Sequence, residues 1–263
     1  MSIKVGVIGA GGRMGVEVCK AVDADPGLEL AAAVDPGFVG KVVVRDPDMQ
    51  DDAFVYSESL QALVDSQCSV SIDFTHLDIS KGNAKFCAEN AIHAVIGTSG
   101  FTESDVAELE EQFTNSNCLV APNFGITAVL LKHLSAIAAP FFETAEIIEL
   151  HHDGKKDAPS GTAMDLAAAM AKASSDWAPD PTEVQNIPGS RGAKGAGDIP
   201  IHAVRMRGMT AHQEVILGTA GQTMTLRQDS YDRASFMPGV ILAAKKIADY
   251  PGISVGLENY MEI

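Results

Sequence analysis

Cysteine is scarce in this sequence, and long apolar runs are absent. The four cysteines are scattered along 263 residues: Cys19, Cys68, Cys87 and Cys118. No two of them have the spacing of a zinc-binding or redox-active pair, so we expect buried, free thiols in a reducing compartment. No run approaches the roughly 20 apolar residues of a membrane-spanning helix. Because a strand pattern begins at Ile3, it leaves no room for a signal peptide, and the sequence predicts a cytoplasmic protein.

Positive charge is also scarce. Lysine and arginine together number 19 against 35 aspartates and glutamates, which gives a formal net charge of -16. A strongly negative protein repels nucleic acids and anionic membranes, so neither is expected as a partner. Any local cluster of basic residues in such a chain therefore requires a specific explanation.

Short apolar runs alternate with helical patterns in the first half of the chain. The predicted strands are 3–8, 28–34, 70–74, 91–96 and 118–121, and the predicted helices between them are 16–22, 58–65, 79–90 and 104–113. Repeated strand–helix units favour a parallel sheet. The strands are almost entirely apolar, as expected when helices cover both faces of that sheet.

The pattern changes after residue 123. Helices are predicted at 128–138, 162–173 and 236–250, strands at 146–150, 201–204, 214–217 and 223–227, and a long loop at 174–198. The last two strands meet around Ala220 and Gly221, as in a hairpin. We therefore expect a mixed or antiparallel sheet in a second domain.

A glycine-rich segment ends the first strand and opens a helix. It contains Gly9, Ala10, Gly11, Gly12, Arg13, Met14 and Gly15. The pattern is G-x-x-G-x-x-G, which departs from the usual dinucleotide fingerprint, but its strand–turn–helix context is that of a phosphate-binding loop. The helix N-terminus offers free N–H groups and the positive end of a dipole. Asp35 closes the second strand, where a carboxylate accepts hydrogen bonds from the adenine ribose. The alternative is a tight turn with no ligand.

These patterns predict an α/β protein with two domains. Residues 1–123 and 234–263 form a dinucleotide-binding domain with a Rossmann-type parallel sheet. Residues 124–233 form a smaller α+β domain with a mixed sheet.

A second signal lies between residues 149 and 162. His151, His152, Lys155 and Lys156 fall within six residues of an otherwise acidic protein, just before a predicted helix. Pro159 and Ser160 stand where helix caps belong. This combination favours a site for a substrate carboxylate, with an imidazole suited to donate a proton near neutral pH. The alternatives are a solvated loop with an ordinary helix cap, or a metal site. A metal site is disfavoured because adjacent strand residues point to opposite faces.

The same segment carries a family resemblance. Residues 149–162 resemble the signature E-x-H-H-x-x-K-x-D-A-P-S-G-T of the dihydrodipicolinate reductases of bacterial diaminopimelate and lysine synthesis. The likeness extends along the chain through residues 9–15, 73–75, 97–100, 121–124 and 233–239. The short length and the Ala-Pro-Asn-Phe segment are most similar to actinobacterial members. The resemblance implies reduction of 4-hydroxy-tetrahydrodipicolinate by NADH or NADPH to tetrahydrodipicolinate and water. It also implies that the domain of residues 124–233 binds the substrate and makes the contacts of a homotetramer.

The resemblance also implies site residues. His151 matches the general acid, and Lys155 matches a second catalytic residue that contacts a substrate carboxylate. The matching substrate-binding positions are His152, Ser160, Gly161, Thr162 and Arg233. The matching cofactor-binding positions are Gly9, Ala10, Gly11, Gly12, Arg13, Met14, Asp35, Gly97, Thr98, Ser99, Ala121, Pro122, Asn123 and Phe124.

The sequence departs from the family at two positions. Ser99 replaces a frequent Thr, and Pro36 follows Asp35 where some members carry an Arg for the NADPH phosphate. An acid at position 35 repels a 2′-phosphate, although Arg13 offers a compensating charge, so we expect NADH to serve at least as well as NADPH. Two other functions remain open at this point. One is a different two-domain dehydrogenase, of the aspartate-semialdehyde type, which needs a catalytic cysteine, or of the homoserine type. The other is a dinucleotide-binding redox sensor.

Overall fold

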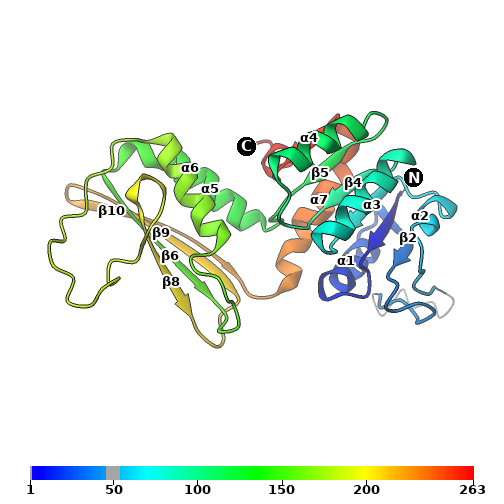
Figure 1. Cartoon of the computed structure of the whole chain (residues 1–263), viewed down its shortest axis with the longest axis horizontal. Coiled ribbons are helices and arrows are strands. Elements are labelled where there is room, and N and C mark those ends of the chain that lie inside the picture. The colour runs from blue at the N-terminus through cyan, green and yellow to red at the C-terminus, as the bar shows by residue number, and fades with distance from the viewer. Residues whose placement is uncertain (1, 46–53) are drawn as a thin grey trace. The chain divides into compact units, whose positions relative to one another are not determined.

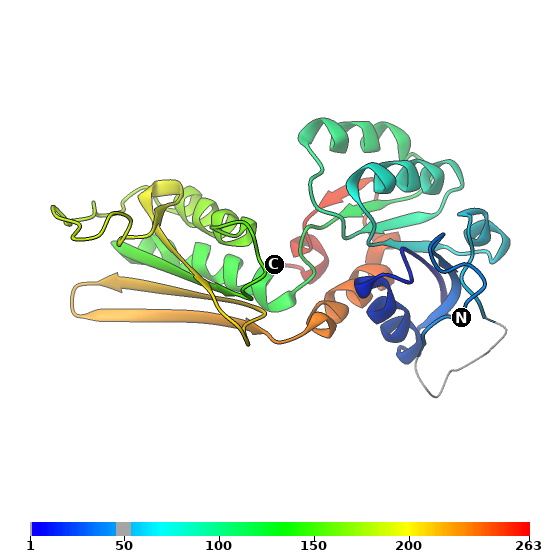
Figure 2. The same ribbon diagram turned by 60° about the horizontal axis from the view of Figure 1, so that its bottom comes forward.

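The computed structural model describes residues 2–45 and 54–263. The chain divides into two compact units (Figures 1 and 2). One unit comprises Met1–Gly125 together with Arg233–Ile263, and the other comprises Ile126–Asp232. The C-terminal segment thus returns to the unit in which the chain begins.

The first unit is built on a parallel sheet with the strand order β11-β5-β4-β3-β1-β2. The strands are β1 (Ile3–Ile8), β2 (Leu28–Val34), β3 (Val70–Asp73), β4 (His93–Ile96), β5 (Cys118–Val120) and β11 (Ile253–Val255). The helices are α1 (Arg13–Ala24), α2 (Gln61–Asp65), α3 (Leu77–Glu89), α4 (Glu103–Gln112), α7 (Met237–Lys246) and α8 (Glu258–Met261), with 3-10 turns η4 (Arg233–Phe236) and η5 (Ile247–Asp249). This is the predicted Rossmann-type sheet.

Helices cover both faces of this sheet (Figure 1). Residues of α2, α3 and α4 share a core with one face, whereas α1 and α7 lie against the other. In α1 the buried residues are Gly15, Val18, Cys19 and Val22, the spacing of one apolar helical stripe. Because both faces are covered, the strands are mostly apolar.

The second unit contains a mixed sheet with the strand order β10-β9-β6-β8-β7. Its strands are β6 (Thr144–His151), β7 (Ala193–Lys194), β8 (Pro200–Arg205), β9 (Ala211–Thr219) and β10 (Gln222–Ser230). Its helices are α5 (Ile126–Ala138) and α6 (Gly161–Ala173), with 3-10 turns η2 (Ala139–Phe141) and η3 (Ala196–Asp198). Strands β6 and β8 are parallel, and the other neighbours are antiparallel, so the expectation of a mixed sheet is confirmed.

The two faces of this second sheet have different surroundings. We call inner the face that carries Ala145 and Ile147, which packs against α5 and α6 around Leu131 and Leu166. The opposite, outer face carries the alternate residues of each strand, beginning with Glu146 on β6. Alternation therefore places Glu149 and His151 on the inner side.

Two predictions for secondary structure were wrong. The final segment is not one helix from 236 to 250, because α7 ends at Lys246 and continues only as the turn η5. Strand β11, which the sequence pattern did not predict, then pairs with β5 at the edge of the parallel sheet. The expected loop 174–198 also contains the two-residue strand β7.

Candidate active site

The glycine-rich turn between β1 and α1 is shaped by contacts that exclude a side chain. Gly9 has a φ of +75°, a conformation that favours glycine. A Cβ on Gly15 would lie 2.1 Å from the carbonyl oxygen of Gly9, so only glycine lets α1 begin so close to the turn. Gly12 caps the helix without a side-chain hydrogen bond. The first N–H groups of α1 are consequently left to bind another acceptor.

Asp35 faces the same turn from the end of β2. Its carboxylate accepts hydrogen bonds from the N–H of Gly11 at 2.9 Å and from the N–H of Gly37 at 3.0 Å. The Phe38 ring lies over Gly11, where an added Cβ would be 2.4 Å from the ring. A glycine loop, an uncapped helix N-terminus and a neighbouring carboxylate fit the diphosphate and ribose of a dinucleotide.

The other predicted nucleotide residues follow strands β4 and β5 at the same carboxyl edge of the sheet. Gly97, Thr98 and Ser99 follow β4, and Thr98 Oγ1 donates to the carbonyl of Thr75, 3.0 Å away, in the turn after β3. After β5, the chain runs through Ala121, Pro122, Asn123 and Phe124. Ligands of open α/β sheets bind at this edge, so the structure gathers these residues where a dinucleotide can reach them.

Two aromatic rings and a buried acid define the shape of that edge. The Phe74 ring fills the space above Gly97, where an added Cβ would be only 2.1 Å from it, and it lies 5.8 Å from the Phe124 ring. The buried carboxylate of Asp73 accepts hydrogen bonds from Asn83 and from the backbone and hydroxyl of Thr75. These contacts hold the turn after β3 rigidly beside the glycine loop.

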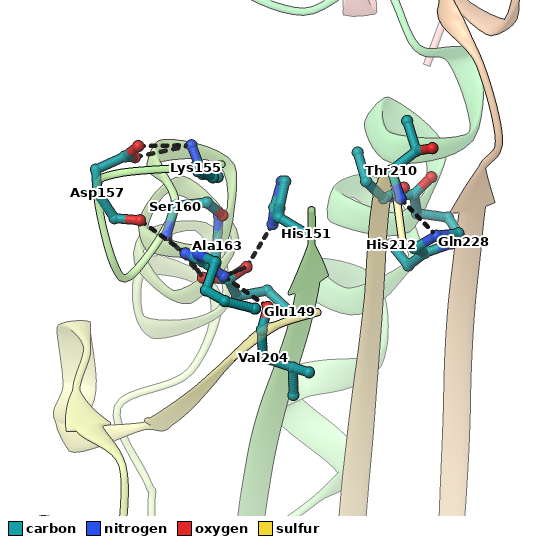
Figure 3. A network of polar contacts seen from close by, with 12 residues as sticks. Glu149, His151, Lys155, Asp157, Ser160, Ala163, Val204, Thr210, His212 and Gln228 are labelled. Carbon is teal, nitrogen blue, oxygen red and sulfur yellow. Dashed lines mark hydrogen bonds and ion pairs between the residues drawn. The ribbon is translucent and has the colours of Figure 1, made fainter. Parts of the chain in front are cut away.

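In the second unit, the end of β6 carries a cluster of charged and polar groups (Figure 3). Glu149 is fully buried on the inner face. Its Oε2 lies 2.5 Å from His151 Nδ1 and 2.8 Å from Arg205 Nη1, and its Oε1 accepts from Arg205 Nη2 at 2.8 Å and from the N–H of Ser160 at 3.1 Å. Residues 149 and 151 share a face of the strand, and the parallel register pairs His151 with Arg205. The sheet itself thus brings the three side chains together.

The loop from residue 152 to 160 adds a lysine and a helix N-terminus to this cluster. Lys155 Nζ donates to both carboxylate oxygens of Asp157, at 2.8 and 2.9 Å. Ser160 caps α6 by accepting a hydrogen bond from the N–H of Ala163. Gly161 and Thr162 form the first turn of that helix, where N–H groups precede the first intrahelical hydrogen bond. This arrangement can bind a carboxylate beside an imidazole.

The remaining predicted substrate residues are placed differently. His152 is exposed and follows the end of β6, whereas His151 is largely buried. Arg233 is exposed at the start of η4, where the chain re-enters the first unit. The structure therefore brings together His151, Lys155 and Ser160 within one unit, and Arg233 belongs to the other.

The environment perturbs two of the titrating groups. Burial lowers the pKa of His151, and the hydrogen bond and charge of Glu149 oppose that shift while Lys155 and Arg205 add to it. Burial alone would raise the pKa of Glu149, but hydrogen bonds from Arg205 and His151 more than compensate, so its pKa lies below the ordinary value. Glu149 is therefore a buried carboxylate in its charged form.

Three polar residues of this cluster were not assigned a role from sequence: Glu149, Asp157 and Arg205. A signal for two of them is present in the sequence. Glu149 continues the alternation of Ala145 and Ile147, so the pattern predicts an acid on the buried face of the strand. A buried carboxylate in turn requires a positively charged partner. Arg205, at the end of the neighbouring strand, is such a partner, but its pairing with Glu149 depends on a strand order that local patterns do not reveal.

The four cysteines are unsuited to nucleophilic catalysis. All are free and buried. Burial raises the pKa of Cys19 and of Cys68 to about 12 and that of Cys87 to about 11, and it raises the pKa of Cys118 as well. A reactive cysteine needs a lowered pKa, so a mechanism of the aspartate-semialdehyde dehydrogenase type is disfavoured.

Residues 2–45 and 54–263 contain no group of three or more His, Cys, Asp or Glu side chains that could hold a metal ion. Within the same residues, no helix has the length and apolar character needed to cross a membrane.

Comparison with known proteins identifies relatives along the whole chain. Residues 3–124 match the family described as dihydrodipicolinate reductase, N-terminus, and residues 126–261 match dihydrodipicolinate reductase, C-terminus. The 4-hydroxy-tetrahydrodipicolinate reductase of Corynebacterium urealyticum is 47% identical over 98% of both chains. The enzyme of the same name from Mycobacterium marinum is 43% identical over 99% of this chain and 100% of its own.

Solved structures agree with these matches. A dipicolinate-bound dihydrodipicolinate reductase from Paenisporosarcina sp. TG-14 is 37% identical, with a TM-score of 0.86 over 98% of this chain and 99% of its own. An amine dehydrogenase from Mycobacterium smegmatis, only 13% identical with a TM-score of 0.63, shares the fold alone.

Fold, site and relatives together define a Rossmann-fold oxidoreductase that uses NAD(P)H. The chain belongs to the dihydrodipicolinate reductase family. The predicted resemblance of the chain to this family, and to its actinobacterial members, is thereby confirmed.

Proposed function

We propose that this chain reduces 4-hydroxy-tetrahydrodipicolinate to tetrahydrodipicolinate with NADH or NADPH, in diaminopimelate and lysine synthesis. The observation that carries the proposal is the cluster at the end of β6. There His151 and Lys155 stand beside the N-terminus of α6, within the segment that has the family signature. Its charges are those required to bind an anionic substrate and to protonate it.

When bound, a reduced nicotinamide supplies a hydride to the substrate, and this chain supplies the groups that bind the substrate and protonate it. One hydride and one proton enter the substrate and one water leaves, which balances the conversion. His151 provides the proton. The Lys155 ammonium binds a substrate carboxylate, and the N–H groups of Gly161 and Thr162 at the positive end of α6 bind it as well. Ser160 keeps this helix end in place through its capping bond. His152 and Arg233 complete the proposed contacts to the two carboxylates.

The proposed nucleotide site lies in the first unit. The N–H groups at the start of α1 and the turn from Gly9 to Met14 bind the diphosphate, and Asp35 binds the adenine ribose. Segments 97–99 and 121–124 line the carboxyl edge of the sheet, where the nicotinamide half binds. The dinucleotide-binding domain thus corresponds to the first unit, Met1–Gly125 with Arg233–Ile263, and the substrate domain to Ile126–Asp232, each boundary within two residues of that expected from sequence.

The preferred nucleotide is proposed from Asp35. Two backbone N–H groups fix its carboxylate beside Gly11, where it meets the ribose of a bound dinucleotide. A fixed negative charge attracts ribose hydroxyls and repels a 2′-phosphate, so we expect kcat/KM with NADH to equal or exceed that with NADPH. The Asp35→Asn variant is expected to lower the NADH/NADPH ratio of kcat/KM. A large preference of the unaltered enzyme for NADPH would contradict this assignment.

A homotetramer is proposed through the second-unit sheets. The outer face carries a row of apolar side chains on neighbouring strands, Ile148 and Leu150 on β6, Val204 on β8 and Ile216 on β9. Such a row on a sheet face that no helix of its own unit covers is suited to pack against a second copy. Light scattering after size-exclusion chromatography measures the assembly, and the Ile216→Glu variant is expected to dissociate it. Four free, buried cysteines are consistent with a reducing compartment, and we propose the cytoplasm.

A coupled assay tests the proposed reaction. A synthase generates the unstable substrate from pyruvate and aspartate semialdehyde, and the oxidation of NADH or NADPH is followed by absorbance. Oxidation that depends on the synthase and is inhibited by pyridine-2,6-dicarboxylate supports the proposal, since that dicarboxylate is bound in the related solved structure. Nucleotide binding without turnover would instead favour a redox sensor, and turnover with a different substrate would favour another dehydrogenase.

A further inference from the structure

The carboxylate of Glu149 is saturated with hydrogen-bond donors. Its side chain is 0% exposed, and each oxygen has two partners: Ser160 N and Arg205 Nη2 at Oε1, Arg205 Nη1 and His151 Nδ1 at Oε2. An ionised carboxylate can only accept hydrogen bonds. His151 Nδ1 must therefore carry a hydrogen, which makes Nε2 the nitrogen that gains and loses a proton. Within residues 2–45 and 54–263, Nε2 has no hydrogen-bond partner.

Arg205 fastens this arrangement to the loop that carries Lys155. Its guanidinium donates one hydrogen bond to each carboxylate oxygen of Glu149, and it also donates to the carbonyl of Asp157 at 2.7 Å. The carboxylate of that same Asp157 holds the Lys155 ammonium. One arginine consequently fixes the acid beside His151 and the backbone beside Lys155.

The charges that face His151 come from three directions. Glu149 on the same strand is negative, Arg205 on β8 is positive, and the loop contributes Lys155, Asp157 and the exposed His152. On β9, the adjoining residues Ala211 and Gln213 carry no charge, and the first turn of α6 contains no acidic residue. Glu149 is thus the negative group in direct contact with the imidazole.

We propose that Glu149, held by Arg205, is a positioning residue that fixes the Nδ1–H tautomer of His151 and so directs proton donation through Nε2. The inference rests on the proposed function, in which His151 is the general acid. Glu149 itself transfers no proton and has no contact with substrate in this scheme. Its effect is to determine which nitrogen of His151 holds the transferable proton, and over which pH range the imidazole holds that proton.

The Glu149→Gln variant tests the proposal because an amide cannot satisfy all four donors. If the amide NH2 takes the place of Oε1, it faces two donors, Ser160 N and Arg205 Nη2. If it takes the place of Oε2, it faces Arg205 Nη1 and His151 Nδ1. Of these partners, only the imidazole can become an acceptor. The variant is therefore expected to convert neutral His151 from the Nδ1–H to the Nε2–H tautomer and to remove a negative charge that favours protonation.

Two measurements detect this change in the tautomer and protonation of His151. Nitrogen-15 NMR of the substrate-free enzyme distinguishes the two tautomers and gives the His151 titration. The second measurement is the pH profile of kcat/KM, which falls as pH rises through the pKa of the general acid. In Glu149→Gln the falling limb is expected to move to lower pH. At neutral pH kcat is expected to drop roughly 10- to 100-fold, by analogy with the loss found when a group that orients a metal-binding histidine is removed.

Two control variants separate positioning from a general loss of structure. Glu146→Gln makes the same change on the same strand, next to His202 and Arg191 on the outer face, and should leave the His151 tautomer and pH limb unaltered. Glu149→Asp retains a charged, acceptor-only group, and it should restore the Nδ1–H tautomer and part of the lost kcat.

Each outcome decides the matter. An Nε2–H tautomer in the unaltered enzyme at neutral pH overturns the proposal, whether or not the variants fold. So does a folded Glu149→Gln enzyme that keeps the original tautomer and pH limb. Because the NMR titration requires no substrate, these results stand apart from the coupled assay. Failure of unaltered enzyme in that assay would refute the proposed function and leave the tautomer result intact.

Discussion

A Glu, a His and an Arg meet on each face of the second-unit sheet, in two different settings. On the inner face Glu149 contacts His151 and Arg205, and on the outer face Glu146 contacts His202 and Arg191. The inner glutamate is 0% exposed, whereas the outer glutamate is 32% exposed. A trio of residue types does not by itself make an active site. Burial makes each inner contact obligatory, because an unpaired buried charge is costly, whereas water can replace the outer partners.

The largest expected difference between the faces is catalytic. His151→Ala should lower kcat by roughly 10²–10⁴, the usual contribution of a general acid. His202→Ala, on the opposite face of the sheet, should change kcat by no more than about twofold, since its imidazole contacts Glu146 and not the His151 cluster. The coupled assay under saturating substrate measures both. Equal losses in the two variants would remove the functional distinction between the faces.

The next difference is in stability. Arg205→Met leaves Glu149 buried without its counter-charge and should lower the free energy of unfolding by about 3–5 kcal/mol. Arg191→Met breaks a pair whose two side chains are 33% and 32% exposed, and it should cost about 1 kcal/mol or less. Denaturant titration of both variants makes the comparison. A small cost for Arg205→Met would mean that water or another cation reaches Glu149.

A smaller effect separates two adjacent lysines. Lys155→Ala removes a charge-assisted contact to a substrate carboxylate and should reduce kcat/KM by roughly 10- to 100-fold, through both kcat and KM. Lys156 is exposed and serves as the matched control, for which Lys156→Ala should change kcat/KM by less than about twofold. If both variants lose activity equally, the loop acts through its total charge rather than through the Lys155 ammonium.

The smallest expected effect is the pH dependence of stability. The pKa of Glu149 lies below its ordinary value of 4.5 in the folded protein, so the charged pair stabilises the fold above that pH and its contribution is lost as pH falls through the lower, folded pKa. The gap in unfolding free energy between the unaltered protein and Glu149→Gln should be widest near neutral pH and should narrow on acidification. Glu146→Gln, measured in parallel, reports what any Glu→Gln change on this strand contributes. A gap that widens in acid would show that Glu149 folds in its protonated form.

Most of the fold was predictable because its signals are local. The runs 3–8 and 28–34 coincide with β1 and β2, since each is a buried apolar strand bounded by residues that end it. The two-residue turn at Ala220 and Gly221 is likewise local, and Gly221 has the expected positive φ of +79°. Strand β11 escaped prediction because it has three residues and forms only by pairing with β5, far earlier in the chain.

The same reasoning explains which parts of the candidate site could be predicted. His151, Lys155 and Ser160 lie in one short segment, so a sequence motif contains them all. Arg205 lies 54 positions after His151 and joins it only through the register of two strands. Glu149 is inside the motif, but its importance follows from complete burial, which depends on the helices that cover the inner face.

The place of β11 in the sheet has a consequence for synthesis on the ribosome. The segment up to residue 125 emerges with β5 as an unprotected edge, because the strand that pairs with it follows the second unit in the chain. The parallel sheet of the first unit is therefore completed by β11 only after the entire second unit has been synthesised. A fragment ending at residue 125 would present that open edge to other chains and is expected to aggregate where the full-length chain does not.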